Sequence, residues 1–278
     1  MAALADFSFS KLVPRPASLT CSAIRPPAPN TRQLLETIPA FTCLLGVCED
    51  NLPVLLDLNN PLAGAVIICA DPKSGKTSLL QSILANTLAA NPLKKIQYAL
   101  LVEKRGEWLS SLDNSRKNGI ERSFTSLLNG EAYQTLDDLA QEVERRLETG
   151  KDTQPVLVLI DGLQLIRSAE PDSWLRLELL LQSGPDVGVW PICSVDSDHA
   201  MGIMRWVNKF TTRIAGRILK PEQAVRICGT PNLHAPRLKP GDFSFRAGDS
   251  WKRFTTAILR EEIEHDILDD DEDDEEEV

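Results

Sequence analysis

The stretch that most constrains the fold is residues 65–84, with the sequence AVIICADPKSGKTSLLQSIL. Five apolar residues at 65–69 predict a buried strand, and a tight turn follows at 70–74. Large apolar side chains then recur at helical spacing, at Leu79, Leu80, Ile83 and Leu84. The stretch therefore predicts a strand, a loop and a helix in immediate succession.

The loop carries residue types that suit a polyphosphate. Backbone N–H groups at a helix N-terminus, together with the positive end of the helix dipole, hold phosphate groups. Gly75 lets the backbone approach the phosphates, Lys76 can reach the β- and γ-phosphates, and the Thr77 hydroxyl can ligate Mg²⁺. The usual pattern is G-x-x-x-x-G-K-[ST], and Ala70 stands at its first position. The alternative is a Gly-Lys-Thr tripeptide that opens an ordinary helix.

The strand and the helix on either side favour the nucleotide loop, so we expect ATP and Mg²⁺ as cofactors. The residues expected to bind the nucleotide are Ala70, Asp71, Pro72, Lys73, Ser74, Gly75, Lys76, Thr77 and Ser78.

Further apolar runs follow along the chain, at 96–102, 155–160 and 189–195, with helical patterns at 136–147 and 174–182 between them. A run that is apolar at every position is typical of a strand covered on both faces. The alternation predicts an α/β fold with a mainly parallel sheet and helices on both faces. The weaker patterns predict a hairpin within 43–58, a polar loop and helix from 103 to about 129, a helix at 198–210, and strands at 213–219, 242–246 and 254–259.

Composition and charge divide the chain of 278 residues into three parts. Residues 1–40 are predicted to be a proline-rich arm with a short helix, and 41–260 one large α/β domain. Residues 261–278 hold 13 acidic residues and no lysine or arginine, so we expect a disordered tail. Without that tail, 30 basic residues stand against 27 acidic ones. The tail either keeps the protein soluble or competes with DNA for a basic groove.

The sequence indicates a cytoplasmic protein. No apolar run approaches the ~18 residues of a membrane span, and the first residues lack the layout of an export signal. The six cysteines are scattered without a C-x-x-C pair, which predicts neither disulfides nor a metal site.

Asp161 ends the apolar run at 155–160 and is the expected partner of Mg²⁺ beside Thr77. A turn aspartate is the alternative, since Asp161-Gly162 is also a good turn pair. Gly162 stands where motor ATPases usually carry a glutamate that activates water, so we expect weak or impaired hydrolysis, which Gly162→Glu would raise. Strand alternation would aim Gln164 differently from position 162. Glu103, at the end of the run at 96–102, is the first other carboxylate to test.

A third strand end, at Ser194, Asp196 and Ser197, offers polar groups that either sense the γ-phosphate or lie in a solvated loop.

Several further short motifs follow one another along the chain. They are Leu44-Leu45-Gly46 with LPVLLDL at 52–58, Glu103-Lys104-Arg105-Gly106-Glu107, Thr212-Arg213-Ile214, Gly241-Asp242-Phe243, and the segment 253–258. With the phosphate loop, they make residues 41–260 resemble the motor domain of the FtsK/SpoIIIE family of P-loop ATPases, which includes the ATPase modules of type VII secretion systems.

The resemblance implies a RecA-like core, ATP binding, assembly into a ring, and transport of double-stranded DNA or of protein. In such a ring Arg213, in the segment similar to the family's Pro-x-Arg-Ile motif, would act on the γ-phosphate of a neighbouring subunit; Arg205 and Arg217 are the other candidates. Two other functions stay open. One is a non-hydrolysing adaptor or regulatory subunit of a larger motor, and the other, more weakly supported, is a small-molecule kinase.

Overall fold

The computed structural model describes residues 31–91, 96–109, 119–128, 131–150, 154–168, 171–229, 238–247 and 250–258. Most of the proline-rich arm and the whole acidic tail lie outside the described residues, so the predictions made for them stay predictions.

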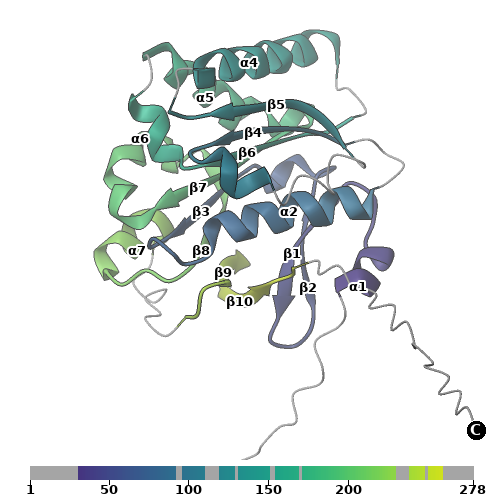
Figure 1. The fold of residues 1–278 in the computed structure, drawn as a ribbon, viewed down its shortest axis with the longest axis vertical. Helices are drawn as coiled ribbons and strands as arrows, with labels where there is room; N and C mark the ends of the chain where they lie inside the picture. The colour runs from purple at the N-terminus through teal and green to yellow at the C-terminus, as the bar shows by residue number, and fades with distance from the viewer. Residues whose placement is uncertain are drawn as a thin grey trace, which may run out of the picture.

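The described residues form one ten-stranded sheet flanked by helices (Figure 1). The strands are β1 (Thr42–Cys48), β2 (Pro53–Asp57), β3 (Ala65–Ala70), β4 (Gln97–Val102), β5 (Ile120–Ser126), β6 (Val156–Asp161), β7 (Val189–Asp196), β8 (Phe210–Ala215), β9 (Asp242–Ala247) and β10 (Ser250–Thr256). Their order across the sheet is β2-β1-β10-β9-β8-β3-β7-β6-β4-β5.

The sheet has two halves. The six strands from β8 to β5 are parallel, whereas the four from β2 to β9 are antiparallel and join β8 through an antiparallel pair. We call them the parallel half and the antiparallel half. The expected hairpin is β1 and β2, and it pairs with β10, where Gly46 lies opposite Thr256.

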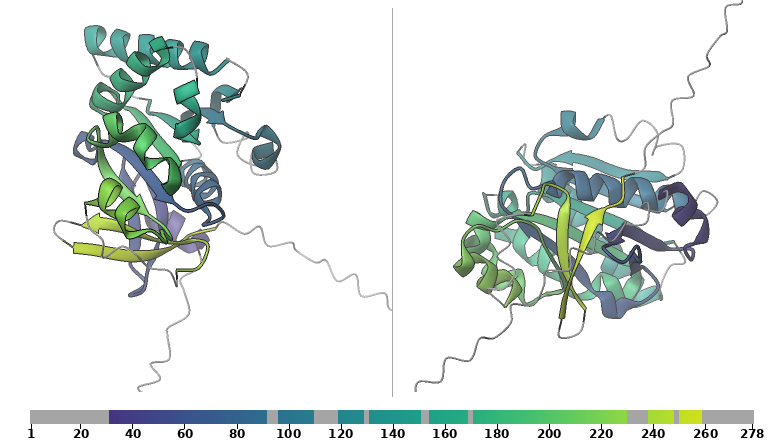
Figure 2. Two further views of the ribbon diagram at one scale, coloured as in Figure 1. Left: turned by 90° about the vertical axis from the view of Figure 1, so that its left-hand side faces the viewer. Right: turned by 90° about the horizontal axis from the view of Figure 1, so that it is seen from below.

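Helices cover both faces, as the alternation predicted (Figure 2). They are α1 (Thr31–Thr37), α2 (Lys76–Ala90), α4 (Glu131–Thr149), α5 (Pro171–Ser183), α6 (Met204–Val207) and α7 (Pro221–Cys228). Shorter 3-10 helices are η1 (Pro61–Ala63), η2 (Leu163–Ser168), η3 (Pro185–Val187) and η4 (Ser197–Ile203), and residues 105–109 form one helical turn.

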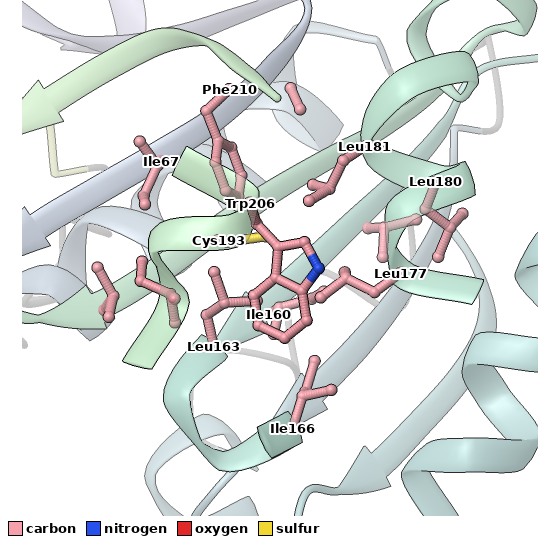
Figure 3. Packing of buried hydrophobic residues seen from close by; sticks show 14 of the residues in the cluster. Ile67, Ile160, Leu163, Ile166, Leu177, Leu180, Leu181, Cys193, Trp206 and Phe210 are labelled. Atoms are coloured by element: carbon pink, nitrogen blue, oxygen red, sulfur yellow. The ribbon is translucent and has the colours of Figure 1, made fainter. Parts of the chain in front are cut away.

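Successive residues of β3 point to opposite faces of the sheet and so divide the core in two. Val66 and Ile68 belong to the cluster that includes α2, while Ile67 and Cys69 belong to the cluster that includes α4, α5, α6 and α7. Figure 3 shows the second cluster, with Trp206 packed among side chains of β6, η2 and α5. All six residues of β3 are buried, which explains its continuous apolar run.

The five described cysteines are buried, and a buried thiol packs as a small apolar side chain. Burial raises the pKa of Cys43 to about 12, so its thiol is unreactive near neutral pH.

Two elements correct the prediction. Strand β5 lies within the segment expected to be loop and helix, and α7 lies in a segment for which no element was expected. β5 is an edge strand that pairs with β4 alone, and its first three residues are exposed, so it has no continuous apolar run. The strand expected at 213–219 is β8 at 210–215, and just beyond it the Gly216 N–H still donates to the Cys69 carbonyl of β3 at 2.9 Å.

A buried amide on α2 joins the helix to the antiparallel half. Asn86 is fully buried, and its Nδ2 donates to the carbonyls of Leu44, at 3.1 Å, and Ala257, at 2.8 Å. One side chain therefore satisfies carbonyls in β1 and just after β10, and it fixes the antiparallel half against the helix that opens at the loop.

Candidate nucleotide site

The loop between β3 and α2 has a backbone that only certain residues adopt without strain. Gly75 caps α2 in the left-handed region, with φ of 91°, and Lys73 has φ of 60°. A Cβ at position 75 would lie 2.9 Å from the backbone nitrogen of Gly241, whose N–H donates to the Ser74 carbonyl at 3.1 Å. A glycine is therefore required where the loop passes against the entry to β9.

Asp71 fixes the loop through its side chain. The Ser197 hydroxyl donates to Oδ1 of Asp71, and the Leu219 N–H donates to Oδ2 at 2.9 Å. The backbone N–H of Asp71 donates to the Arg217 carbonyl at 2.8 Å. Asp71 thus joins the loop to the segments that follow β7 and β8, and both oxygens of its carboxylate accept hydrogen bonds from these segments.

Lys76 is held by three oxygens. Its Nζ donates to the carbonyls of Ala70, at 3.1 Å, and Asp71, at 2.9 Å, and forms an ion pair with Asp196 at 2.7 Å. The Lys76 side chain is 10% exposed, so it lies at the floor of the site. A phosphate that binds Lys76 exchanges for at least one of these partners, because an ammonium group has three donors.

The oxygens expected to hold Mg²⁺ lie together. Thr77 Oγ1 donates to Asp161 Oδ2 at 2.8 Å, and Ser194 Oγ donates to Asp161 Oδ1 at 2.7 Å. Hydroxyl and carboxylate oxygens suit Mg²⁺, which in nucleotide sites takes one or two protein ligands besides phosphates and water. The pair fits that ion, although no group of three or more His, Cys, Asp or Glu residues within the described part of the chain could hold a metal.

A cavity of about 480 Å³ lies over the loop. Six of the nine expected loop residues line it, namely Pro72, Lys73, Gly75, Lys76, Thr77 and Ser78, while Ala70, Asp71 and Ser74 are buried. The remaining walls are Glu103, Lys104 and Glu107 after β4, Asp161 at the end of β6 with Gly162 and Gln164 after it, Ser194 and Asp196 at the end of β7, and Pro240. Its volume lies within the range of small-molecule sites.

The cavity brings together two candidate groups for handling water. Val102, the last residue of β4, pairs in register with Asp161, so Glu103 follows one residue beyond the level of Asp161. Gln164 also lines the cavity, and its Oε1 is buried without a hydrogen-bond partner. Strand alternation was expected to aim Gln164 differently from position 162, but alternation does not apply here, because β6 ends at Asp161 and η2 begins at Leu163; both residues line the cavity.

The backbone at Gly162 also corrects the expectation for Gly162→Glu. Gly162 has φ of 107°, and a Cβ there would lie 3.1 Å from Leu165 Cδ1. A glutamate at this position would adopt a strained backbone, so the substitution would not simply supply the missing group.

Arg213 lies away from the cavity. Its Nη1 donates to the Ile227 carbonyl at 2.7 Å in α7, and its Nη2 donates to the Val207 carbonyl at 3.1 Å in α6. Arg205 lies over the Trp174 ring, 4.7 Å from its centroid. These contacts give both arginines a part in packing within the chain, and an action on a neighbouring subunit's γ-phosphate stays a prediction.

No family model matches the chain. Among curated proteins it is similar to transcription termination factor Rho: 28% identical over 166 residues to that of Mycobacterium leprae (59% of this chain, 25% of the relative), and 32% identical over 154 residues to that of Micrococcus luteus (54% and 20%). The chain thus matches a quarter or less of the length of these relatives.

Solved structures show the same fold at low sequence identity. The conjugation coupling protein TcpA of pCW3, with bound ATPγS, superposes with a TM-score of 0.61 at 17% identity over 80% of this chain and 67% of that one. EccC ATPases 2 and 3 of Thermomonospora curvata give 0.61 at 15% identity (80% and 41%), and EssC ATPases 2 and 3 of Geobacillus thermodenitrificans give 0.60 at 15% (81% and 46%).

The expected RecA-like α/β fold is therefore confirmed, and so is the likeness in fold to a conjugation coupling protein and to secretion ATPases. Within the described residues, no helix has both the length and the apolar character needed to cross a membrane.

Proposed function

We propose that the protein binds Mg·ATP in this cavity and works as a motor-type ATPase. The observation that supports this most is the convergence of Lys76, Thr77 and Asp161 at the cavity, the first two from the start of α2 and the third from the end of β6. Lys76 would bind the β- and γ-phosphates, and bound Mg²⁺ would supply neutralising charge at the phosphate oxygens. Thr77 and Asp161 would hold that ion.

Hydrolysis would be slow for a motor. A general base typically contributes ~10²–10⁴ in rate, and no carboxylate follows Asp161 directly. Glu103, across the cavity from the loop, is the carboxylate best placed to accept the proton of an attacking water. Gln164 can orient that water through its unpaired Oε1 but cannot take its proton.

The substrate we propose is double-stranded DNA, moved by a ring of subunits in the cytoplasm. A conjugation coupling protein shares the fold, and secretion ATPases share it too, so a protein substrate is the competing possibility. Arg213 would act in trans in such a ring only if its hydrogen bonds to the carbonyls of Phe210, Ile227 and Val207 were exchanged for a phosphate.

A second candidate function is a non-hydrolysing, nucleotide-binding adaptor of a larger motor. The backbone at Gly162 favours it, because φ of 107° disfavours any side chain at the position where a motor carries its glutamate.

The experiment that tests the proposal is ATP binding by calorimetry and ATP turnover, with and without double-stranded DNA. Lys76→Ala removes the ammonium group at the floor of the site. Lys220→Ala is its matched control, because Lys220 is also paired with an aspartate, Asp198, at 2.9 Å, but lies exposed on the surface.

We expect wild type and Lys220→Ala to bind Mg·ATP and Lys76→Ala to bind none. Equal binding by all three would refute the nucleotide site. Binding without turnover, with or without DNA, would favour the adaptor. Turnover of tens per second would refute slow hydrolysis.

A further inference from the structure

Trp108 contacts the metal carboxylate, although nothing in its sequence context marks it as part of a site. Its indole Nε1 donates to Asp161 Oδ2 at 3.3 Å, the same oxygen that accepts from Thr77 Oγ1. The side chain is 1% exposed and belongs to the core cluster that includes α2. An indole N–H buried there is directed at a carboxylate, which makes a charge-assisted hydrogen bond.

Trp108 is itself buried, but it lies next to Glu107 in the short segment whose other residues line the cavity. Residues 105–109 form a helical turn that directly follows Glu103 and Lys104 in the chain. Besides the bond from Trp108 to Asp161, a second hydrogen bond joins this turn to α2, since Gln81 Nε2 donates to the Glu107 carbonyl at 2.7 Å. Glu103, Lys104 and Glu107 from this short segment all line the cavity.

The geometry therefore points to Trp108 as a positioning residue, which orients the Asp161 carboxylate for Mg²⁺ and holds the wall carrying Glu103 at a fixed distance from it. This inference rests on the proposed nucleotide site. Asp161 Oδ1 is oriented by Ser194, and Oδ2 by Thr77 and Trp108. When Thr77 turns its oxygen toward the metal, the indole remains to fix Oδ2.

A matched control lies in the same core. Trp190, on β7, is also 1% exposed and in the same cluster, but its Nε1 has no hydrogen-bond partner. Trp108→Phe and Trp190→Phe therefore remove the same atoms from similar surroundings, and only the first removes a bond to Asp161.

The test is the Mg²⁺ dependence of ATP binding, with binding in EDTA as the second measurement. We expect Trp108→Phe to need about three- to ten-fold more Mg²⁺ for half-maximal effect, the range that one lost hydrogen bond gives. Its affinity for ATP in EDTA should equal that of wild type, and Trp190→Phe should match wild type in both measurements. A general loss of packing would lower both affinities together.

Two results would overturn the inference. If wild type binds Mg·ATP and Trp108→Phe shows the same Mg²⁺ dependence, the inference alone fails; if wild type does not bind, the proposed function fails as well. If Trp108→Phe does not fold, a second measurement takes the place of the binding test, namely the tryptophan emission of the wild type and of Trp190→Phe. Emission should then change when Mg²⁺ is added to the ATP-bound protein, and an unchanged emission in both proteins contradicts a contact at the metal carboxylate.

Discussion

The parallel and antiparallel halves of the sheet contribute differently to the site. Nearly all of the cavity is built at the carboxyl ends of parallel strands, β3, β4, β6 and β7, whereas the connection into the antiparallel half supplies Pro240 alone. In open α/β sheets, ligands bind outside the carboxyl ends of the strands, where helix N-termini and loop groups gather. The antiparallel half instead contacts the loop at Gly241 and holds α2 through the two carbonyls that accept from Asn86.

The largest expected effect lies in the parallel half. Glu103→Gln should lower ATP turnover by ~10²–10⁴ if Glu103 is the general base, with little change in ATP affinity. Steady-state turnover and calorimetry measure the two quantities. Glu49→Gln, in the exposed turn of the antiparallel hairpin, is the control and should turn over ATP at the wild-type rate. Equal rates of ATP turnover for the two variants would show that Glu103 is not the general base.

The next effect lies at the joint between the halves and concerns stability. Asn86→Leu leaves the carbonyls of Leu44 and Ala257 without their donor, so the free energy of unfolding should fall by about 2–4 kcal/mol. Denaturant unfolding measures it. Asn59→Leu, at an exposed turn, should change it by less than ~0.5 kcal/mol. A small loss for Asn86→Leu would mean that the two halves hold together without this amide.

A glycine pair isolates the contact between the loop and the antiparallel half. Gly75→Ala places a Cβ at φ of 91° and 2.9 Å from Gly241 N, whereas Gly150→Ala has φ of 95° with nothing within 4 Å. An alanine at such a positive φ costs about 1–3 kcal/mol in either variant. The difference in stability between the two variants therefore measures the clash with Gly241. The temperature of thermal unfolding and the affinity for ATP should both fall further for Gly75→Ala than for Gly150→Ala. Identical losses would show that the loop does not depend on Gly241.

The smallest effect is a pH dependence on the outer face of the parallel half. Hydrogen bonds from Arg145, with the nearby Arg146 and Arg122, lower the pKa of Glu142 on α4 from 4.5 to about 2. A depressed pKa contributes stability that is present above the unfolded value and is lost as pH falls toward the folded one. The loss should stay below about 1 kcal/mol down to pH 4 and grow toward pH 2.

Glu142→Gln should flatten this part of the profile, measured by denaturant unfolding at each pH. An unchanged slope between pH 4.5 and 2 would contradict the assignment to Glu142.

Much of the parallel half could be predicted, because strands buried on both faces leave continuous apolar runs such as β6 and β7. The pairing of Thr77 with Asp161 was expected from the loop and the end of that run, and the two side chains do meet. Edge strand β5 was missed since pairing on one side leaves half of it exposed.

The rest of the site depends on contacts between segments far apart in the chain, which leave no local pattern. Trp108 is a single aromatic residue in a polar stretch, and its partner lies 53 residues away. The ion pair of Lys76 with Asp196 and the approach of Gly241 to Gly75 are of the same kind. Gln164 was expected to point differently from position 162 because strand alternation was extended beyond Asp161, into η2.

The pairing of β1 with β10 sets an order of events during synthesis on the ribosome. β1 ends at Cys48 and its partner β10 begins at Ser250, so some two hundred residues must be made before this edge of the hairpin finds its neighbour. The six parallel strands, β3 to β8, lie entirely within that interval and emerge before β10. Long-range pairings form late because loop closure costs entropy before any contact is gained. The nascent chain thus carries its phosphate loop for some time before Gly241 arrives behind it, and hairpin β1–β2 waits with an unpaired edge that a chaperone or a second nascent chain can reach.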